Sequence, residues 1–96
     1  MDIENKKYLP LGTVVLLQGA SKRLMITGFV GKTPEIKDQI FDYSGCVYPE
    51  GFSSYKEVFV FNHSQIAKVI SLGYIDDEQI AFEKKLEEKV SQLGNK

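Results

Sequence analysis

Cysteine and histidine are nearly absent from this sequence, and their scarcity limits its chemistry. Its 96 residues include one cysteine, Cys46, and one histidine, His63. A single thiol forms no internal disulfide, so nothing in the chain points to an oxidising compartment. No second histidine and no cysteine lies at metal-ligand spacing from His63, so a zinc site lacks its parts. We therefore expect no metal and no cofactor.

The chain also lacks an excess of charge and a long apolar run. It has 12 basic and 13 acidic residues, for a formal net charge of −1. This balance argues against a dedicated nucleic-acid binder, whose mark is a basic patch. Its apolar runs are no longer than residues 14–17, far below the roughly 20 residues that span a bilayer. No apolar stretch follows a basic start, so we expect a cytoplasmic protein without membrane insertion.

What is present is one small domain that begins with strand patterns. β-branched and apolar residues predict strands at 13–17, 24–30, 40–48 and 58–61. Gly28 lies inside the second strand, where a glycine often marks a β-bulge. Proline, glycine and charged residues between the second and third strands predict a surface loop over residues 31–39.

A turn follows the third predicted strand. Tyr48-Pro49-Glu50-Gly51 places a proline two residues before a glycine, which is turn chemistry. We expect Gly51 to have a positive φ.

Two helix starts follow the strands. Asn62 with Gln65 three residues later resembles a capping box, and Ile66, Val69 and Ile70 then share one helical face. Gly73 would end this first helix in the left-handed conformation that favours glycine.

Asp76 and Gln79 repeat the capping pattern and predict a second helix over residues 77–93. Its apolar residues recur at spacings of four, four and three and make it amphipathic. They are Phe82, Leu86, Val90 and Leu93.

The order of strands and then helices predicts an α+β fold. We expect about four antiparallel strands in a curled sheet or a small, partly open barrel, followed by two C-terminal helices. The organisation would be a flexible N-terminus (1–8), an α+β domain (9–75) and the C-terminal amphipathic helix (76–96).

Residues that carry chemistry have simpler structural explanations here. His63 opens a capped helix, where polar residues are common. Cys46 lies in an apolar strand, where a free cysteine behaves as a small buried side chain. The acids 76–78 complement a helix dipole. Lys22, Arg23 and Lys32 accompany no phosphate-binding glycine motif. We expect no catalytic centre.

Aromatic residues are more suggestive of binding. Tyr48 and Phe52 flank the turn, and amphipathic aromatics around an exposed turn suit a protein partner. The apolar stripe of the last helix is a second candidate, through Phe82, Leu86, Val90 and Leu93, for a helical partner or a second copy of the chain.

Four spaced motifs resemble a small Firmicutes family of unknown function. They are Leu9-Pro10-Leu11-Gly12 with the strand after it, the turn at 48–51, Phe61-Asn62-His63, and Gly73-Tyr74 before the acids. Genes of that family lie beside toxins with an N-terminal LXG domain, which the type VII secretion system of Gram-positive bacteria exports.

The resemblance implies a cytoplasmic accessory or chaperone-like protein that binds a cognate LXG effector before export. One alternative is an immunity protein that binds the toxin domain. Others are an enzyme that uses His63 with Glu50 or Asp76, and a structural subunit of an unrelated complex.

Overall fold

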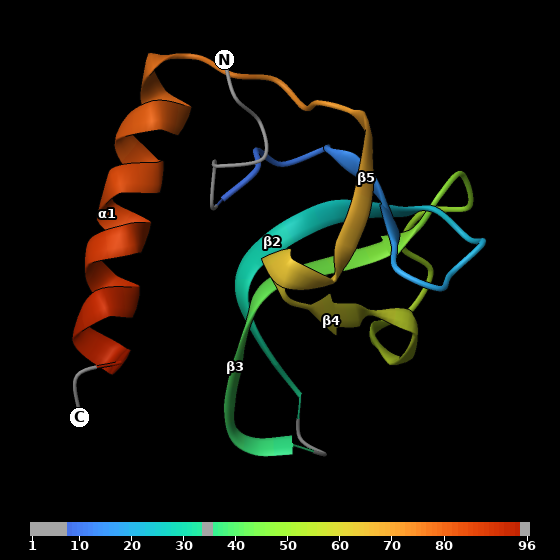
Figure 1. Cartoon of the computed structure of the whole chain (residues 1–96), viewed down its shortest axis with the longest axis horizontal. Coiled ribbons are helices and arrows are strands. Elements are labelled where there is room, and N and C mark those ends of the chain that lie inside the picture. The colour runs from blue at the N-terminus through green and yellow to red at the C-terminus, as the bar shows by residue number, and fades with distance from the viewer. Residues whose placement is uncertain (1–7, 34–35, 95–96) are drawn as a thin grey trace.

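The computed structural model describes residues 8–33 and 36–94, and these form five strands and one α-helix (Figure 1). The strands form one antiparallel sheet in the order β4-β3-β2-β1-β5. The α+β class and the antiparallel sheet are therefore confirmed, with one strand more and one helix fewer than the sequence predicts. In chain order the elements are β1 (Val14–Leu17), β2 (Leu24–Thr33), β3 (Ile36–Val47), the 3-10 turn η2 (Tyr55–Glu57), β4 (Phe59–Phe61), the 3-10 turn η3 (His63–Gln65), β5 (Ile66–Ser71) and α1 (Asp77–Gly94).

The sheet is strongly curled because its two edge strands are consecutive in the chain. Only residues 62–65 separate β4 from β5, although three strands lie between them in the sheet. A flat sheet would hold its edges about 19 Å apart, at about 4.8 Å per strand. Most of the link is the η3 turn, which rises only about 2 Å per residue. The link therefore cannot cross a flat sheet, and the edges must bend toward each other.

The predicted first helix is wrong, because the segment after η3 is strand β5. Gln65 does make the expected contact, and its Oε1 accepts the backbone N–H of Asn62 at 2.8 Å. That contact closes only a 3-10 turn. The chain then extends along the free side of β1, where Val69 lies opposite Val15 and Ile66 opposite Leu17. Gly73 accordingly ends no helix, and it is not among the glycines with positive φ.

The predicted loop over residues 31–39 is mostly strand. β2 continues to Thr33 and β3 begins at Ile36, with Gly31 opposite Phe41. Figure 1 shows these two arms reaching beyond the rest of the sheet. Paired strands satisfy each other's backbone hydrogen bonds, so a segment rich in polar residues can also form them. Gly28 lies at a register shift between β2 and β3, as the sequence predicts.

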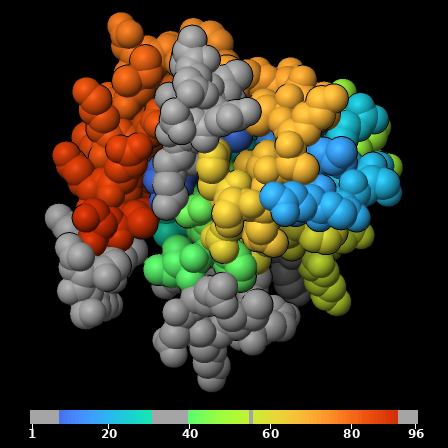
Figure 2. Space-filling model, in the orientation of Figure 1, coloured from blue at the N-terminus to red at the C-terminus, as the bar shows by residue number. Residues whose placement is uncertain are grey.

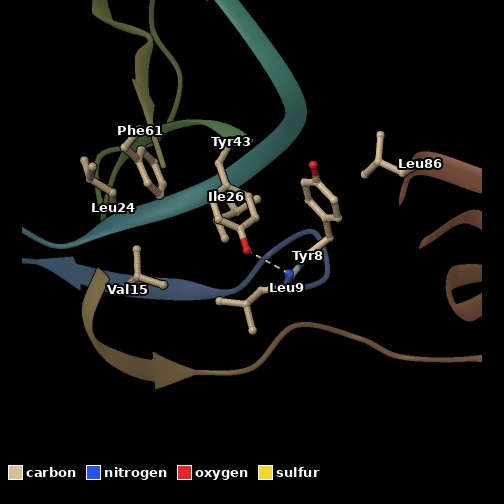
Figure 3. Packing of buried hydrophobic residues seen from close by; sticks show 8 residues of the cluster. All are labelled: Tyr8, Leu9, Val15, Leu24, Ile26, Tyr43, Phe61 and Leu86. Carbon is tan, nitrogen blue, oxygen red and sulfur yellow. Dashed lines mark hydrogen bonds between the residues drawn. The ribbon is translucent and has the colours of Figure 1, made fainter. Parts of the chain in front are cut away.

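The hydrophobic core joins the sheet to the helix through the segment that precedes β1. Tyr8 and Leu9 are buried, and Figure 3 shows Tyr8 between Tyr43 of β3 and Leu86 of α1. Leu86 is 8% exposed and belongs to the core, and Val90 packs against it. The core cluster consists of Tyr8, Leu9, Val15, Leu24, Ile26, Tyr43, Phe61 and Leu86.

The helix α1 agrees with its predicted bounds and lies to one side of the sheet. In the space-filling view α1 forms one side of the molecule, in red and orange, and β5 lies on the same face in yellow-orange (Figure 2). Among the residues described, no helix is long and apolar enough to cross a membrane.

Candidate functional site

A groove of about 510 Å³ opens between the start of α1 and the curled sheet. Its volume is within the range of ligand-binding pockets in proteins. Its walls come from the turn before β1, from β2, from the segment after β5 and from the first turns of α1. The lining residues are Leu11, Thr27, Gly28, Phe29, Tyr74, Asp76, Glu78, Gln79 and Phe82.

One wall of the groove is fixed by the buried hydroxyl of Thr13. This hydroxyl donates to the carbonyl of Pro10 at 2.7 Å and accepts the N–H of Gly73 at 3.0 Å. The turn through Leu11 therefore lies against the segment that continues into Tyr74. Gly73 carries no side chain because a Cβ there would collide with the carbonyl oxygen of Leu11. These bonds hold Leu11 and Tyr74 at the groove although both are strongly exposed, at 52% and 78%.

The second wall is the bulged part of β2. Ile26 lies opposite Gly45 and Gly28 opposite Ser44, so Thr27 is the extra residue. A Cβ on Gly28 would lie 2.6 Å from the Ser44 hydroxyl oxygen, so the Ser44 side chain would have to turn away. Phe29 follows the bulge and connects groove and core.

The ring of Phe29 makes contacts in both directions. Its centroid is 6.1 Å from that of Tyr8 and 6.2 Å from that of Tyr43, both of which are buried. On the groove side it lies 5.8 Å from the ring of Phe82. Aromatic pairs prefer tilted or edge-to-face contacts at such separations. Phe29 therefore positions Phe82 against the sheet.

The third wall is the N-terminal part of α1. Asp76 caps the helix, since its Oδ1 accepts the N–H of Gln79 at 2.8 Å. The side-chain oxygen Oε1 of Gln79 is buried and has no hydrogen-bond donor among the described residues, so the second half of the predicted capping box does not form. Phe82 is one turn further on and remains 50% exposed.

A hydrogen-bond network around Tyr43 ties three distant segments together. The Tyr43 hydroxyl accepts the N–H of Leu9 at 3.0 Å and lies 2.7 Å from Nδ1 of His63. The backbone N–H of His63 donates to Asp42 at 2.8 Å. Burial raises the pKa of the Tyr43 hydroxyl above its ordinary value. The network holds the segment before β1 and the η3 turn on β3.

The carboxylates that an enzyme would pair with His63 have structural partners. Glu50 forms an ion pair with Lys22, in which Nζ lies 2.7 Å from Oε1. The Lys22 side chain also donates a hydrogen bond to Glu50, and this bond lowers the pKa of Glu50. Asp76 caps α1.

The turn after β3 forms a second exposed surface. Gly51 has the expected positive φ, +82°, and the bond between Tyr48 and Pro49 is cis. Phe52 is 63% exposed. The guanidinium of Arg23 lies 5.3 Å from the centre of the Tyr48 ring, so this ring already has a cationic neighbour within the chain.

The structure separates the predicted binding residues into three groups. Phe82 lines the groove, while Tyr48 and Phe52 lie on the turn surface. Leu86 and Val90 pack in or against the core, and the side chain of Leu93 lies outside the described part of the chain. The structure also places Cys46 in the core, 2% exposed, as expected for a small buried side chain.

Sequence reasoning missed Leu11, Phe29 and Tyr74 as lining residues. Tyr74 follows Gly73 and Leu11 precedes Gly12, and an apolar residue beside a glycine, outside the predicted strands and helices, was the signal in the sequence.

These features define a small α+β protein with a curled five-stranded sheet and an aromatic groove at the start of its helix. The chain belongs to the family described as Domain of unknown function (DUF4176), whose model matches residues 8–82. That match extends from Tyr8 to Phe82 and so includes the groove-lining residues that the structure describes. No curated protein and no solved structure matches the chain.

Proposed function

We propose that this chain is a non-catalytic accessory protein that binds an LXG-type effector in the cytoplasm before its export by type VII secretion. The groove is the binding site in this proposal. The observation that carries it is the exposure of Leu11, Tyr74 and Phe82 around one groove, at 52%, 78% and 50%. Exposed apolar patches of this kind, bordered by polar residues, are typical of protein interaction sites.

The shape of the groove favours a polypeptide over a small molecule. Small-molecule pockets bury most of their ligand, and their lining side chains are correspondingly enclosed. Here the side chains of Leu11, Tyr74 and Phe82 are at least half exposed. Such an open site suits a segment of a larger partner, which covers the groove and contacts the surface around it.

The apolar contacts alone are too weak to hold a partner. Covering three half-exposed side chains contributes about 1 kcal/mol each, or about 3 kcal/mol together. A micromolar complex requires about 8 kcal/mol. The effector must therefore contact more of the surface than these three side chains, including polar groups at the groove.

Co-purification with the two halves of the neighbouring LXG protein tests the proposal. We expect the full chain to retain the half that contains the LXG domain. Retention of the toxin half alone would identify an immunity protein instead, and retention of neither half would contradict the proposal.

A matched pair of variants then tests the site. Tyr74→Ala removes the most exposed aromatic of the groove, and Phe52→Ala removes a comparably exposed aromatic of the turn surface. We expect Tyr74→Ala to weaken binding more than about tenfold and Phe52→Ala less than about twofold, because binding energy concentrates at a few anchors. The opposite order would move the site to the turn.

A further inference from the structure

The groove has an apolar side and an acidic edge. Leu11, Phe29 and Phe82 line the apolar side, and Asp76 and Glu78 lie at the edge formed by the start of α1. A partner that fits both parts must present an apolar group and a positive charge close together.

The acidic edge has more negative charge than the helix itself neutralises. Three consecutive carboxylates, from Asp76 to Glu78, surround the N-terminus of α1. A helix N-terminus carries a partial charge of only about +0.5. Asp76 serves as the cap, since it accepts the N–H of Gln79. Glu78 lines the groove and is exposed, so its charge faces solvent beside the apolar side chains.

Within the described residues, no basic side chain at the groove compensates this charge. None of the residues that line the groove is a lysine, an arginine or a histidine. Lys22 forms its ion pair with Glu50, and Arg23 lies over the ring of Tyr48. The first basic residues of α1, Lys84 and Lys85, come after Phe82 and line no part of the groove.

Gln79 supplies a second observation. Its side-chain oxygen is buried in the groove wall with no donor in the described part of the chain. A buried acceptor without a donor is unfavourable, and rotation of this side chain toward the groove would let an incoming N–H group relieve this. Lysine, arginine and the backbone of a polypeptide all carry such donors.

We propose that the groove binds a polypeptide segment of the partner in which an apolar side chain is flanked by lysine or arginine. The apolar side chain lies against Phe29 and Phe82, and the basic group lies at Glu78. This inference rests on the proposed function and names the chemistry of the partner at that site. It requires that binding weaken as salt concentration rises, because a charge pair at an exposed edge is screened by ions.

Short peptides test the groove chemistry without the effector. The probes are three peptides with one central leucine, flanked on both sides by lysine, by glutamine or by glutamate. Backbone amide shifts of the labelled full chain report binding at Tyr74, Gln79 and Phe82. We expect the lysine peptide to shift these amides and to bind about tenfold more tightly than the glutamate peptide, with the glutamine peptide between them. Equal binding of the lysine and glutamate peptides, or shifts only outside the groove, would overturn the inference.

Charge variants test the same chemistry with the LXG protein. Glu78→Lys and Glu88→Lys make the same change on the same helix, but Glu88 does not line the groove. It lies ten residues further along, about 15 Å away. We expect Glu78→Lys to weaken binding about tenfold and Glu88→Lys less than about twofold.

Glu78→Gln provides a milder variant if lysine at the helix N-terminus impairs folding. It should weaken binding and flatten the salt dependence. Binding of the LXG protein that is unchanged in both Glu78 variants would overturn the inference and leave the proposed function intact. Failure of the wild-type chain to bind the LXG protein would contradict the proposed function, while the peptides would still decide the groove chemistry.

Discussion

The hydroxyl of Tyr43 and the ring of His63 form a hydrogen bond of 2.7 Å between β3 and the η3 turn. The same hydroxyl accepts the backbone N–H of Leu9 at 3.0 Å. The tautomer of His63 sets which of the two groups donates in this bond. One buried side chain thus connects the segment before β1, the central sheet and the link that closes it.

Removing this hydroxyl should destabilise the protein. Tyr43→Phe keeps the ring in the core but leaves the buried N–H of Leu9 without its acceptor. We expect a loss of about 1–3 kcal/mol of unfolding free energy. In a domain of this size, thermal unfolding would show a midpoint lower by about 4–8 °C per kcal/mol. Tyr48→Phe removes the same group from an exposed position and should leave the midpoint unchanged. Equal midpoints for Tyr43→Phe and wild type would show that the hydroxyl contributes nothing.

The same burial predicts an alkaline limit to stability. The pKa of Tyr43 is raised, because burial disfavours its charged form; the hydrogen bond from Leu9 opposes this, and the negative charge of Asp42 adds to it. Unfolded tyrosine ionises near pH 10. Between that value and the higher folded pKa the unfolded state binds fewer protons, so stability falls as pH rises. The stabilising contribution is complete below about pH 10 and is lost above it.

Absorbance of ionised tyrosine measures this effect. The chain has five tyrosines. We expect Tyr8 and Tyr43 to ionise above pH 10, together with unfolding, because burial raises the pKa of both. Tyr43→Phe should lose part of this late step. Ionisation of Tyr8 and Tyr43 near pH 10 in the folded protein would contradict the assignment.

Gly51 offers a test of backbone conformation alone. Its φ is +82°, and no atom lies within 4 Å of the position that a Cβ would occupy. The Cβ that Gly51→Val adds therefore meets no other residue, and the expected cost is that of a left-handed β-branched residue, about 1–2 kcal/mol. Gly51→Asn, which tolerates this conformation, should cost less. Equal thermal midpoints for the valine and asparagine variants would contradict this account.

Local patterns in the sequence predict the elements that depend on local contacts. The strands β1 to β4, the Gly28 bulge, the Gly51 turn and α1 with its Asp76 cap all agree with the structure in kind. Each depends on residues close together in the chain, such as the cap bond from Gln79 to Asp76.

The sequence predicts a helix where β5 lies because the spacing of the apolar residues in this segment is that of a helix. Ile66 and Val69 are three residues apart, yet they face Leu17 and Val15, which are two apart. The register shift between these pairs adds one residue to β5, so two side chains on one face acquire a helical interval. The segment is a strand because it pairs with the otherwise unpaired side of β1, which is distant in the sequence.

The sequence does not predict the groove either, because the groove also depends on contacts between distant residues. Its walls come from four segments, and the contact between Leu11 and Gly73 joins residues far apart in the chain. Phe82 was identified because it belongs to a periodic helix. No periodic pattern contains Leu11 or Tyr74.

The close contact at Gly73 predicts a sensitive position beside the groove. Gly73→Ala places a methyl group against the carbonyl oxygen of Leu11, and backbone must move to accommodate it. We expect a loss of about 1–3 kcal/mol, as for other overpacked sites. Gly19→Ala is the control: its Cβ would meet no atom within 4 Å, so only its positive φ contributes. A larger loss in thermal midpoint for Gly19→Ala than for Gly73→Ala would show that the backbone contact is not tight.

The helix α1 should be required for folding rather than merely attached. Leu86 is 8% exposed and contributes to the same core as Tyr8 and Tyr43, whereas Ile80 on the same helix is 42% exposed. Leu86→Ala leaves a cavity beside Tyr8 and should lower the unfolding free energy by about 2 kcal/mol or more. Ile80→Ala should cost less than about 1 kcal/mol, since 42% of its surface already contacts water. Denaturant titration of the two variants decides between a helix that completes the core and one that only carries a binding surface.

A truncation that ends at Asp77 should unfold for the same reason, because it exposes the side of Tyr8 that Leu86 covers. A truncated chain that stayed folded, with a cooperative transition near the wild-type midpoint, would show that α1 is a separable element.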